Sequence, residues 1–248
     1  MLRRCGMKKT ILVASGKGGA GKTTVSALLG EAFAFGGDKV LIIELDSGLR
    51  SLDVALGVTK NLLFDFGDIV RSGCKIEDAA MPCPFCKNLS VICASAKNME
   101  FSGDDLKKIT ESCFAFDYVI FDCPAGIGST LENAAAVSDM ALIIATPDPS
   151  SVRAARNTSL LIEKCGLKNR RLIIERCPDK PQKLAPLKNL DEMIDGTELQ
   201  LIGVIREDPL VRRAIDSGAA LTNESVNYKA FRNIAERISG KQIPLGFK

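Results

Sequence analysis

The sequence predicts an α/β fold: a single doubly wound, mostly parallel β-sheet with helices on both faces. Short runs rich in β-branched residues alternate with helical patterns over all 248 residues, as in a parallel sheet wound by crossover helices. Runs such as VLIIEL and MALIIAT are apolar at nearly every position, as expected for strands covered on both faces. No linker or repeat interrupts the pattern, so we expect one domain over 1–248, with 1–9 as an N-terminal extension and 240–248 as an irregular tail.

The individual elements follow from local composition. Strands are expected at the short β-branched runs, namely Thr10–Ser15, Lys39–Leu45, Leu89–Cys93, Tyr118–Asp122, Met140–Thr146, Arg171–Arg176 and Leu199–Ile205. Helices are expected where apolar residues recur at helical spacing, namely Lys22–Phe35, Asp104–Phe114, Ser150–Cys165, Leu184–Ile194, Asp208–Ser217 and Ser225–Ile238. The irregular stretch Ala79–Lys87 predicts a surface loop.

Composition excludes several kinds of chemistry. The chain contains no His, which rules out Ser-His-Asp and Cys-His triads and any His-ligated zinc site. The net charge is only +3, with both signs interleaved, so we expect no nucleic-acid binding. The sequence has no signal-peptide pattern and no apolar run of the roughly 20 residues that span a bilayer. We therefore expect a cytoplasmic protein with reduced cysteines.

A phosphate-binding motif follows the first expected strand. Gly16, Gly21, Lys22 and Thr23 fit G-x-x-x-x-G-K-[ST] between a strand and a helix, which is the context the motif requires. Glycines let backbone N–H groups point at phosphate oxygens, and the helix N-terminus adds partial positive charge. Lys22 would reach the β- and γ-phosphates and act in catalysis, and the Thr23 hydroxyl would ligate Mg²⁺. The expected cradle comprises Gly16, Lys17, Gly18, Gly19, Ala20, Gly21, Lys22, Thr23 and Thr24.

Two carboxylates are expected beside this loop. Asp122 ends the apolar run YVIFD and Asp46 follows VLIIEL, so both lie at the carboxyl ends of strands, where open α/β sheets bind ligands. Asp122 is expected to hold Mg²⁺ partly through water, and Asp46 to orient the attacking water as a catalytic residue.

Several segments resemble the MinD/ParA family of deviant Walker A P-loop ATPases, and its MinD branch in particular. A second lysine, Lys17, stands near the start of the loop, as in the family signature. DSGLRSLDVALG (46–57) resembles switch I, and FDCPAGIG (121–128) resembles the Walker B and switch II segment. PDPSSVRAA (147–155) and LIGVIREDPLVRRAIDSGAAL (201–221) are also similar, so the resemblance covers most of the chain.

The resemblance implies an ATPase that binds Mg-ATP, dimerises across its nucleotides and hydrolyses ATP to ADP and phosphate. Lys17 would cross to the partner's nucleotide and neutralise phosphate charge, a role similar to that of an arginine finger. No Arg stands in or next to the loop in the sequence. By position, the residues that would bind adenine are Glu175, Arg176 and the loop 206–208, including Glu207.

Four residues depart from the family pattern. Glu44 stands where Asp is usual, and Ala154 replaces the Asp that usually follows SSVR. Glu175 and Arg206 occupy adenine-site positions where Asn or Thr and Pro are commoner. These departures affect the expected dimer contacts and the base site, whereas the phosphate motif is intact.

The C-terminal tail departs as well. MinD proteins generally end in a short amphipathic helix, whereas this chain ends ISGKQIPLGFK, with Pro244 and Gly246 inside that segment. Pro costs about 3 kcal/mol and Gly about 1 kcal/mol in a helix interior, so we expect no helix and no strong autonomous membrane binding. Ile243, Leu245 and Phe247 are expected to pack on the body, and a partner would mediate any contact with the inner membrane face.

The pair Cys83-Pro-Phe-Cys86 has several interpretations. A closed zinc site needs four ligands, which a symmetric dimer could supply from two chains. Some MinD relatives carry Fe–S clusters in that way, although their C-x-x-C lies later in the chain. A metal or cluster site, a redox pair and incidental loop cysteines all stay open.

The leading hypothesis is a nucleotide-switched spatial regulator of cell-division site placement, with slow turnover that a partner protein stimulates. The alternatives are an Fe–S scaffold or carrier that uses Cys83 and Cys86, a ParA-like DNA-partition ATPase, and a metabolic P-loop enzyme. The segments GLRSLD and PSSVR favour the first hypothesis.

Overall fold

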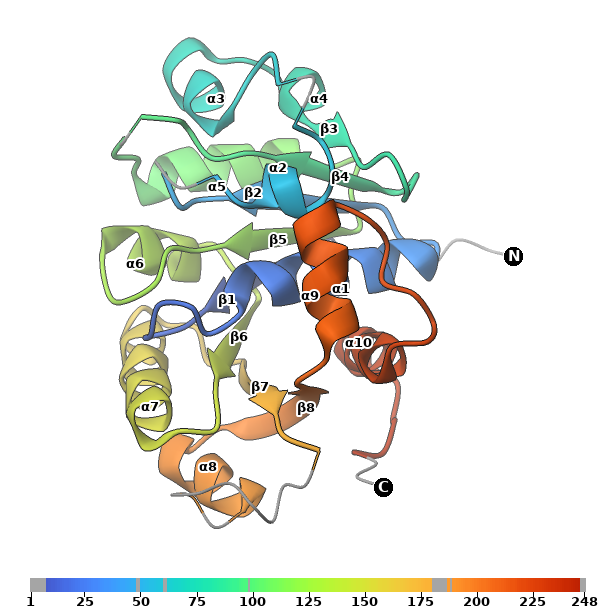
Figure 1. Ribbon diagram of the computed structural model, residues 1–248. Helices are drawn as coiled ribbons and strands as arrows, with labels where there is room; N and C mark the ends of the chain where they lie inside the picture. The colour runs from blue at the N-terminus through green and yellow to red at the C-terminus, as the bar shows by residue number, and fades with distance from the viewer. Residues whose placement is uncertain are drawn as a thin grey trace.

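The computed structural model describes residues 8–47, 50–59, 62–97, 99–179, 187 and 189–245. An eight-stranded sheet with the order β3-β4-β2-β5-β1-β6-β7-β8 runs through its centre (Figure 1). The strands are β1 (Lys9–Ala14), β2 (Val40–Glu44), β3 (Met81–Pro82), β4 (Leu89–Ile92), β5 (Tyr118–Asp122), β6 (Met140–Ala145), β7 (Arg170–Cys177) and β8 (Gln200–Arg206). Every neighbouring pair is parallel except β3 and β4. The predicted fold class is confirmed.

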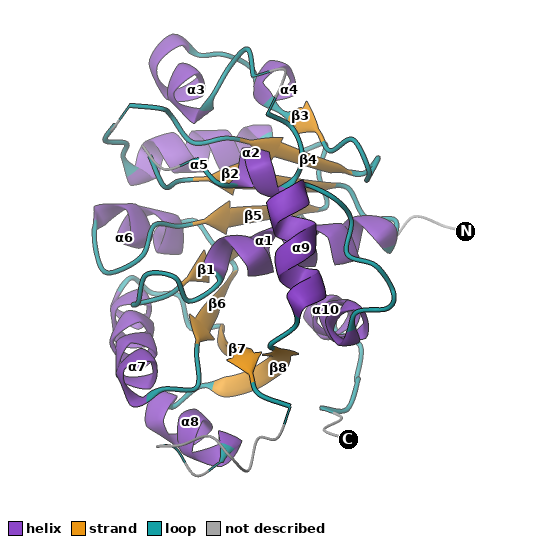
Figure 2. Cartoon of the chain, in the orientation of Figure 1, coloured by secondary structure: helices purple, strands orange, loops and turns teal. Residues whose placement is uncertain are grey.

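Helices cover both faces of the sheet (Figure 2). One face packs against α1 (Lys22–Phe35), α2 (Leu52–Ala55), α9 (Pro209–Ser217) and α10 (Val226–Ile238). The other packs against α3 (Phe66–Ser72), α4 (Ile76–Ala79), α5 (Gly103–Ser112), α6 (Ser129–Ala136), α7 (Pro149–Lys164) and α8 (Leu190–Thr197). Along β1, Ile11 and Val13 enter the first core and Leu12 and Ala14 the second, because successive strand side chains point to opposite faces. Burial on both faces explains why these strands are continuously apolar.

The prediction of a surface loop at Ala79–Lys87 is wrong in part. Met81–Pro82 forms the antiparallel edge strand β3, and the N–H of Cys83 continues the ladder by donating to the carbonyl of Leu89 at 2.8 Å. Cys83 and Cys86 are both buried. Tertiary packing against β4 decides this segment, because a two-residue strand has no sequence pattern of its own.

The first part of the helix expected at Leu184–Ile194 falls mostly on residues outside the described ranges. Within the described residues, helix α8 covers Leu190–Thr197. Sequence patterns did not predict α2, α3, α4 or α6, which have at most eight residues each. Helices this short owe their stability to tertiary packing rather than to periodicity.

The tail after α10 is held by one arginine. Nε and Nη2 of Arg237 donate to the carbonyls of Ile243 and Pro244, and Nη1 donates to the carbonyl of Ile202 in β8. Ile243 is half-buried as expected, whereas Leu245 is 41% exposed, so its predicted packing on the body is wrong. The prediction for Phe247 lies outside the described residues. Among the described helices, none is long and apolar enough to span a bilayer.

Candidate functional site

The predicted phosphate loop joins β1 to α1 at the carboxyl edge of the sheet, where α/β sheets bind their ligands. Gly19 and Gly21 have φ values of 71° and 99°, which glycine adopts without steric strain. Gly16 packs against α7, where a Cβ would lie 2.5 Å from the carbonyl oxygen of Ala154. This loop conformation therefore requires glycine at three positions, and it leads into a helix N-terminus with free N–H groups.

Lys22 is the first residue of α1, and its side chain lies close to the loop backbone. Its Nζ lies 3.2 Å from Oγ of Ser15, and that hydroxyl donates to the carbonyl of Lys17 at 2.8 Å. The side chain is nearly buried. Because an ammonium group has three N–H donors, Lys22 can hold Ser15 and a phosphate oxygen at the same time.

The two predicted magnesium ligands are hydrogen-bonded to each other. Oγ1 of Thr23 donates to Oδ2 of Asp122 at 2.8 Å, and Oγ of Ser26 donates to Oδ1 at 2.9 Å. Burial raises the pKa of Asp122 to about 7, against the hydrogen bonds from Thr23 and Ser26, which lower it. A hydroxyl and a carboxylate are the oxygen donors that Mg²⁺ prefers, and a divalent cation would favour the ionised carboxylate. These residues fit a magnesium site.

Glu44 connects this pair to α2. Its carboxylate ends β2 and accepts hydrogen bonds from the N–H groups of Ser51 (2.8 Å), Leu52 (3.1 Å) and Ala94 (3.2 Å). Oγ of Ser51 in turn lies 3.3 Å from Oγ1 of Thr23. The longer side chain of Glu44 thus holds the start of α2 beside the magnesium pair. Sequence reasoning missed Ser51, because no local pattern shows that this serine lies next to Thr23.

Asp46 lies just beyond β2 and is half-buried. Burial raises its pKa, and the nearby positive charge of Lys22 lowers it. Its expected position at the end of the second strand is confirmed, and its role in orienting water stays a prediction.

Lys17 contacts its own chain in this structure. Its Nζ lies 3.1 Å from Oδ1 of Asp148 and 3.1 Å from Oγ of Ser150. Asp148 caps α7 by accepting from the N–H of Ser151, and it also accepts from Oγ1 of Thr146. Burial alone would raise the pKa of Asp148, but hydrogen bonds from these four residues hold it well below its usual range. Lys17 therefore has an ionised partner within its own chain.

The predicted base-site residues lie in a β-bulge where the register between β7 and β8 shifts. Arg176 has a φ of 55°, which is uncommon for a residue with a Cβ. The bulge places both side chains at the phosphate loop. Arg176 donates to the carbonyl of Gly19, and a Cβ on Gly21 would lie 2.7 Å from the carboxyl carbon of Glu175. Tertiary structure therefore places an arginine beside the loop, although none is near it in the sequence.

The Glu175 carboxylate is buried, with only 5% of the residue exposed. Its Oε2 lies 3.1 Å from Nε of Arg176 as an ion pair, but the orientation of this contact is not that of a hydrogen bond. Burial raises the pKa of Glu175 to about 7; the positive charge of Arg176 lowers it and the negative charge of Glu207 raises it. A buried carboxylate oxygen without a hydrogen-bond donor is an unusual feature that needs an explanation.

The loop 206–208, which follows β8, lies next to the end of β7 that carries Glu175 and Arg176. The N–H of Glu207 donates to the carbonyl of Cys177 at 2.9 Å. The side-chain amide of Asn227 bonds to both backbone groups of Arg206, and Asp208 caps α9. The ends of β7 and β8 thus bring the predicted base-site residues together.

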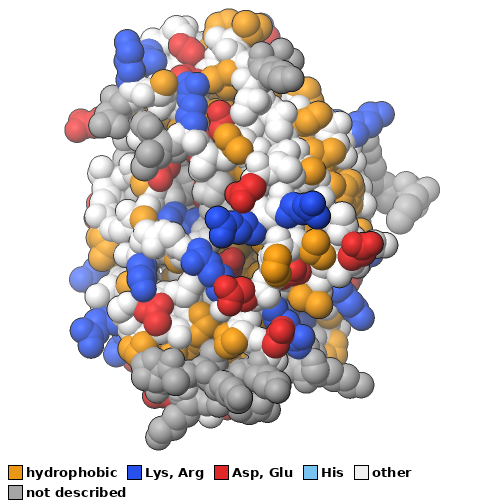
Figure 3. Space-filling model, in the orientation of Figure 1, with side chains coloured by type: hydrophobic (Ala, Val, Ile, Leu, Met, Phe, Trp, Pro, Cys, Tyr) orange, Lys and Arg blue, Asp and Glu red, His pale blue; other side chains and the backbone are white. Residues whose placement is uncertain are grey.

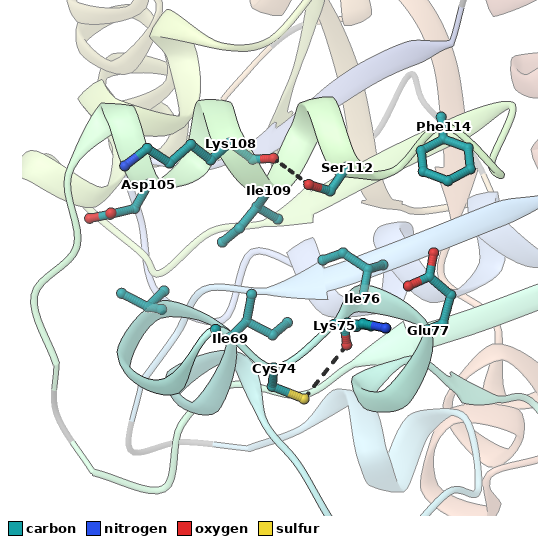
Figure 4. Close-up of a pocket in the computed structure, with 12 residues that line it drawn as sticks. Ile69, Cys74, Lys75, Ile76, Glu77, Asp105, Lys108, Ile109, Ser112 and Phe114 are labelled. Carbon is teal, nitrogen blue, oxygen red and sulfur yellow. Dashed lines mark hydrogen bonds between the residues drawn. The ribbon is translucent and has the colours of Figure 1, made fainter.

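A groove of about 500 Å³ lies elsewhere, between α5 and the helices α3 and α4 (Figure 4). Its apolar walls include Ile69, Ile76, Ile109 and Phe114. The described residues that line it include none of the predicted site residues. We therefore place the candidate site at the open phosphate loop, because the phosphate-binding chemistry lies there.

Similarity to known proteins shows which family this chain belongs to. The family model for an AAA domain matches residues 8–173, which include the phosphate loop and Asp122. The septum site-determining protein MinD of Bacillus subtilis (strain 168) is 34% identical over 246 residues, covering 96% of this chain and 92% of that protein. The chain belongs to the MinD/ParA family of P-loop ATPases. MinD of Thermotoga maritima is also 34% identical over 246 residues, covering 96% of this chain and 91% of that protein.

Solved structures of the MinD/ParA family agree with this assignment. A chain of the MinC:MinD cell division protein complex of Aquifex aeolicus superposes with a TM-score of 0.89 at 30% identity, covering 96% of this chain and 98% of that chain. MinD from Pyrococcus horikoshii OT3, complexed with Mg-ADP, has a TM-score of 0.80 at 26% identity, covering 94% of this chain and 96% of that chain.

The cysteine pair lies away from the phosphate loop, in the hairpin between β3 and β4. Sγ of Cys83 lies 3.7 Å from the carbonyl oxygen of Leu56, at the end of α2. No group of three or more His, Cys, Asp or Glu side chains among the described residues is arranged to hold a metal ion. Cluster binding by Cys83 and Cys86 stays a prediction that needs ligands from a second chain.

Proposed function

We propose that this chain is a Mg-ATP-dependent ATPase that dimerises across its nucleotides and acts as a switched regulator of cell-division site placement. The observation that carries the proposal is the contact between Thr23 and Asp122 at a phosphate loop that also holds Lys22. The Mg-ADP complex of the Pyrococcus horikoshii relative supports ATP and Mg²⁺ as ligands. The curated MinD relatives support the role in cell division.

In this proposal, each residue around the phosphate loop has a defined task. The N–H groups of loop 16–24 and the Nζ of Lys22 would hold phosphate oxygens. Thr23 and Asp122 would hold magnesium, which neutralises phosphate charge when bound. Asp46 would orient the water that attacks the terminal phosphate, and its raised pKa suits it to accept a proton.

Two contacts support a switch. Glu44 joins the start of α2 to Thr23 through Ser51, so a change at the magnesium pair would move α2. Lys17 would have to leave Asp148 and Ser150 before it could reach a partner's phosphates. The intrachain contact therefore competes with dimerisation, which favours slow unstimulated turnover.

A partner protein would set the timing of turnover, as the MinC:MinD complex of Aquifex aeolicus suggests by analogy. We propose a cytoplasmic protein that reaches the inner membrane face through such a partner, because Arg237 holds the tail against the body. Lys and Arg side chains are interspersed with Asp and Glu on the face shown in Figure 3, so this face carries no large patch of one sign for nucleic acid.

The test is light scattering and turnover in Mg-ATP and in Mg-ADP, for the natural chain and for Lys17→Ala. We expect a dimer in Mg-ATP, a monomer in Mg-ADP and slow hydrolysis, with dimer and turnover both sharply reduced in the variant. Lys87→Ala is the matched control, because it removes an exposed lysine of the β3–β4 hairpin. A monomer in Mg-ATP whose activity is indifferent to Lys17 would contradict the proposal.

A further inference from the structure

The order of the strands decides where a nucleotide base must lie. Thr23, Asp122 and Asp46 are on the side of β5 and β2, whereas the sheet continues on the other side of β1 through β6, β7 and β8. With the terminal phosphates beside the magnesium pair, the nucleoside extends over the carboxyl ends of β7 and β8. Glu175 and Arg176 lie at the end of β7, where the bulge turns them toward the loop.

The Glu175 carboxylate is buried at this corner, where it forms an ion pair with Nε of Arg176 at 3.1 Å. Its Oε2 is buried without a hydrogen bond from the described residues, and its carboxyl group presses against Gly21 of the phosphate loop. Arg176 already donates to the carbonyl of Gly19. A ligand with N–H groups would supply the well-oriented hydrogen bond that the ion pair with Arg176 does not give this buried carboxylate.

Donor and acceptor chemistry separates the two purines. An ionised carboxylate only accepts hydrogen bonds, whereas a protonated carboxyl can donate and accept. Guanine presents two adjacent donors, the ring N1–H and the 2-amino group. Adenine presents its 6-amino group next to ring nitrogens that accept. An ionised Glu175 therefore matches guanine, and a protonated Glu175 matches adenine.

We propose that Glu175 reads the base of the bound nucleotide and admits guanine nucleotides as well as adenine nucleotides, in a ratio set by its protonation. The inference rests on the proposed function, because it assumes a nucleotide in the phosphate loop.

Neutral pH lies within the range in which this carboxyl titrates. The pKa of Glu175 is raised to about 7 by burial, with Arg176 of β7 opposing and Glu207 of the loop after β8 adding to the increase. The phosphate loop meets the carboxyl through Gly21, which brings no charge. We therefore expect Glu175 to be mainly protonated at pH 6 and mainly ionised at pH 8.

The experiment measures binding of N-methylanthraniloyl-ADP and N-methylanthraniloyl-GDP, each with Mg²⁺, at pH 6 and pH 8. Diphosphates avoid hydrolysis, and the ratio of the two Kd values cancels the titration of the phosphates, which both ligands share. We expect the ratio to move toward GDP by about 100-fold over this range, because GDP binding strengthens about tenfold as the ionised fraction rises and ADP binding weakens about tenfold as the protonated fraction falls.

Glu175→Gln keeps the shape and removes the charge, so the variant should prefer ADP by about tenfold at both pH values. Glu175→Asn is a second variant with the same expected loss of GDP binding, in case the first one folds poorly. Glu236→Gln on α10, which removes a carboxylate paired with Lys241, should keep the pH-dependent ratio of the natural chain.

ADP binding with no GDP binding at either pH would overturn the inference and leave the proposed function intact. An unchanged ratio in Glu175→Gln would do the same. Failure of the natural chain to bind either nucleotide would overturn the proposed function together with the inference.

Discussion

The candidate site has a phosphate half, formed by the loop 16–24, Asp46 and Asp122, and a base half, formed by Glu175, Arg176 and the loop 206–208. The two halves differ in how many of their buried polar groups are hydrogen-bonded within the chain. Asp122 is deeply buried and has a raised pKa, yet each of its oxygens accepts a hydrogen bond, from Thr23 or Ser26. Glu175 is nearly as buried and has a pKa raised to about the same value, but one of its oxygens accepts no hydrogen bond from the described residues. The phosphate half is therefore preorganised, whereas our proposal has a ligand complete the base half.

Backbone strain follows the same division. The left-handed positions of the phosphate loop, Gly19 and Gly21, are glycines, whereas the base half places the left-handed conformation on Arg176. Strain and unsatisfied groups persist where the surrounding structure enforces them, commonly at functional sites. Under the proposed function, the comparison predicts that affinity resides mainly in the phosphate half and specificity in the base half.

The largest expected effect comes from removing the Lys22 ammonium group, which tests whether the phosphate half supplies most of the binding affinity. We expect Lys22→Ala to weaken Mg-ADP binding on the order of 100-fold, about 2.7 kcal/mol, because the variant loses a nearly buried cation at the phosphates. Isothermal titration calorimetry would measure the change, with Lys241→Ala as the control, since that lysine is exposed and lies beyond α10. Binding within threefold of the natural chain would place the main affinity elsewhere.

Gly21 of the phosphate loop packs against Glu175 of the base half, so a substitution at Gly21 tests the contact between the two halves. We expect Gly21→Ala to cost about 2–3 kcal/mol of stability, because it combines the left-handed backbone penalty with a collision against Glu175. Gly19→Ala is the matched control, since its Cβ would meet nothing within 4 Å and it would pay only the backbone penalty, about 1–2 kcal/mol. Urea denaturation would measure both.

The double variant Gly21→Ala/Glu175→Ala should recover the difference between these two costs, because it removes the collision and leaves the backbone penalty. If Gly21→Ala were no more destabilising than Gly19→Ala, the close packing of Glu175 on the loop would be refuted.

The smallest expected effect concerns a buried carboxylate outside the site. Burial raises the pKa of Glu31 in α1 to about 7, opposed by a hydrogen bond from the N–H of Leu221. Because the folded-state pKa is above the unfolded one, stability is greatest at pH values below the unfolded pKa and falls as pH rises toward 7.

The variant Glu31→Gln cannot ionise, so its stability relative to the natural chain should rise by about 1–2 kcal/mol between pH 4.5 and 7.5. Urea denaturation at each pH would measure this, with Glu77→Gln, an exposed carboxylate of α4, as the control. A pH-independent difference would show that Glu31 does not keep its proton on folding.

The sheet and the phosphate loop were largely predictable, because their signals are local. The strand runs are apolar throughout, and the spacing from Gly16 to Thr23 needs only consecutive residues. The edge strand β3 and the short helices were not predictable, since two to eight residues carry too little pattern to compete with alternatives. The wrong expectation of a surface loop at Ala79–Lys87 has the same cause, because pairing with β4 buries Cys83.

The sequence by itself determined the fold class, the family and the phosphate motif, because each depends on residues adjacent in the chain or on whole-chain similarity. Only the tertiary structure decided that Ser51 lies beside Thr23, that Lys17 contacts Asp148, and that Arg176 lies against Gly19. These contacts join residues 28, 131 and 157 positions apart, and parallel strands bring such residues to one edge only after the whole sheet has formed.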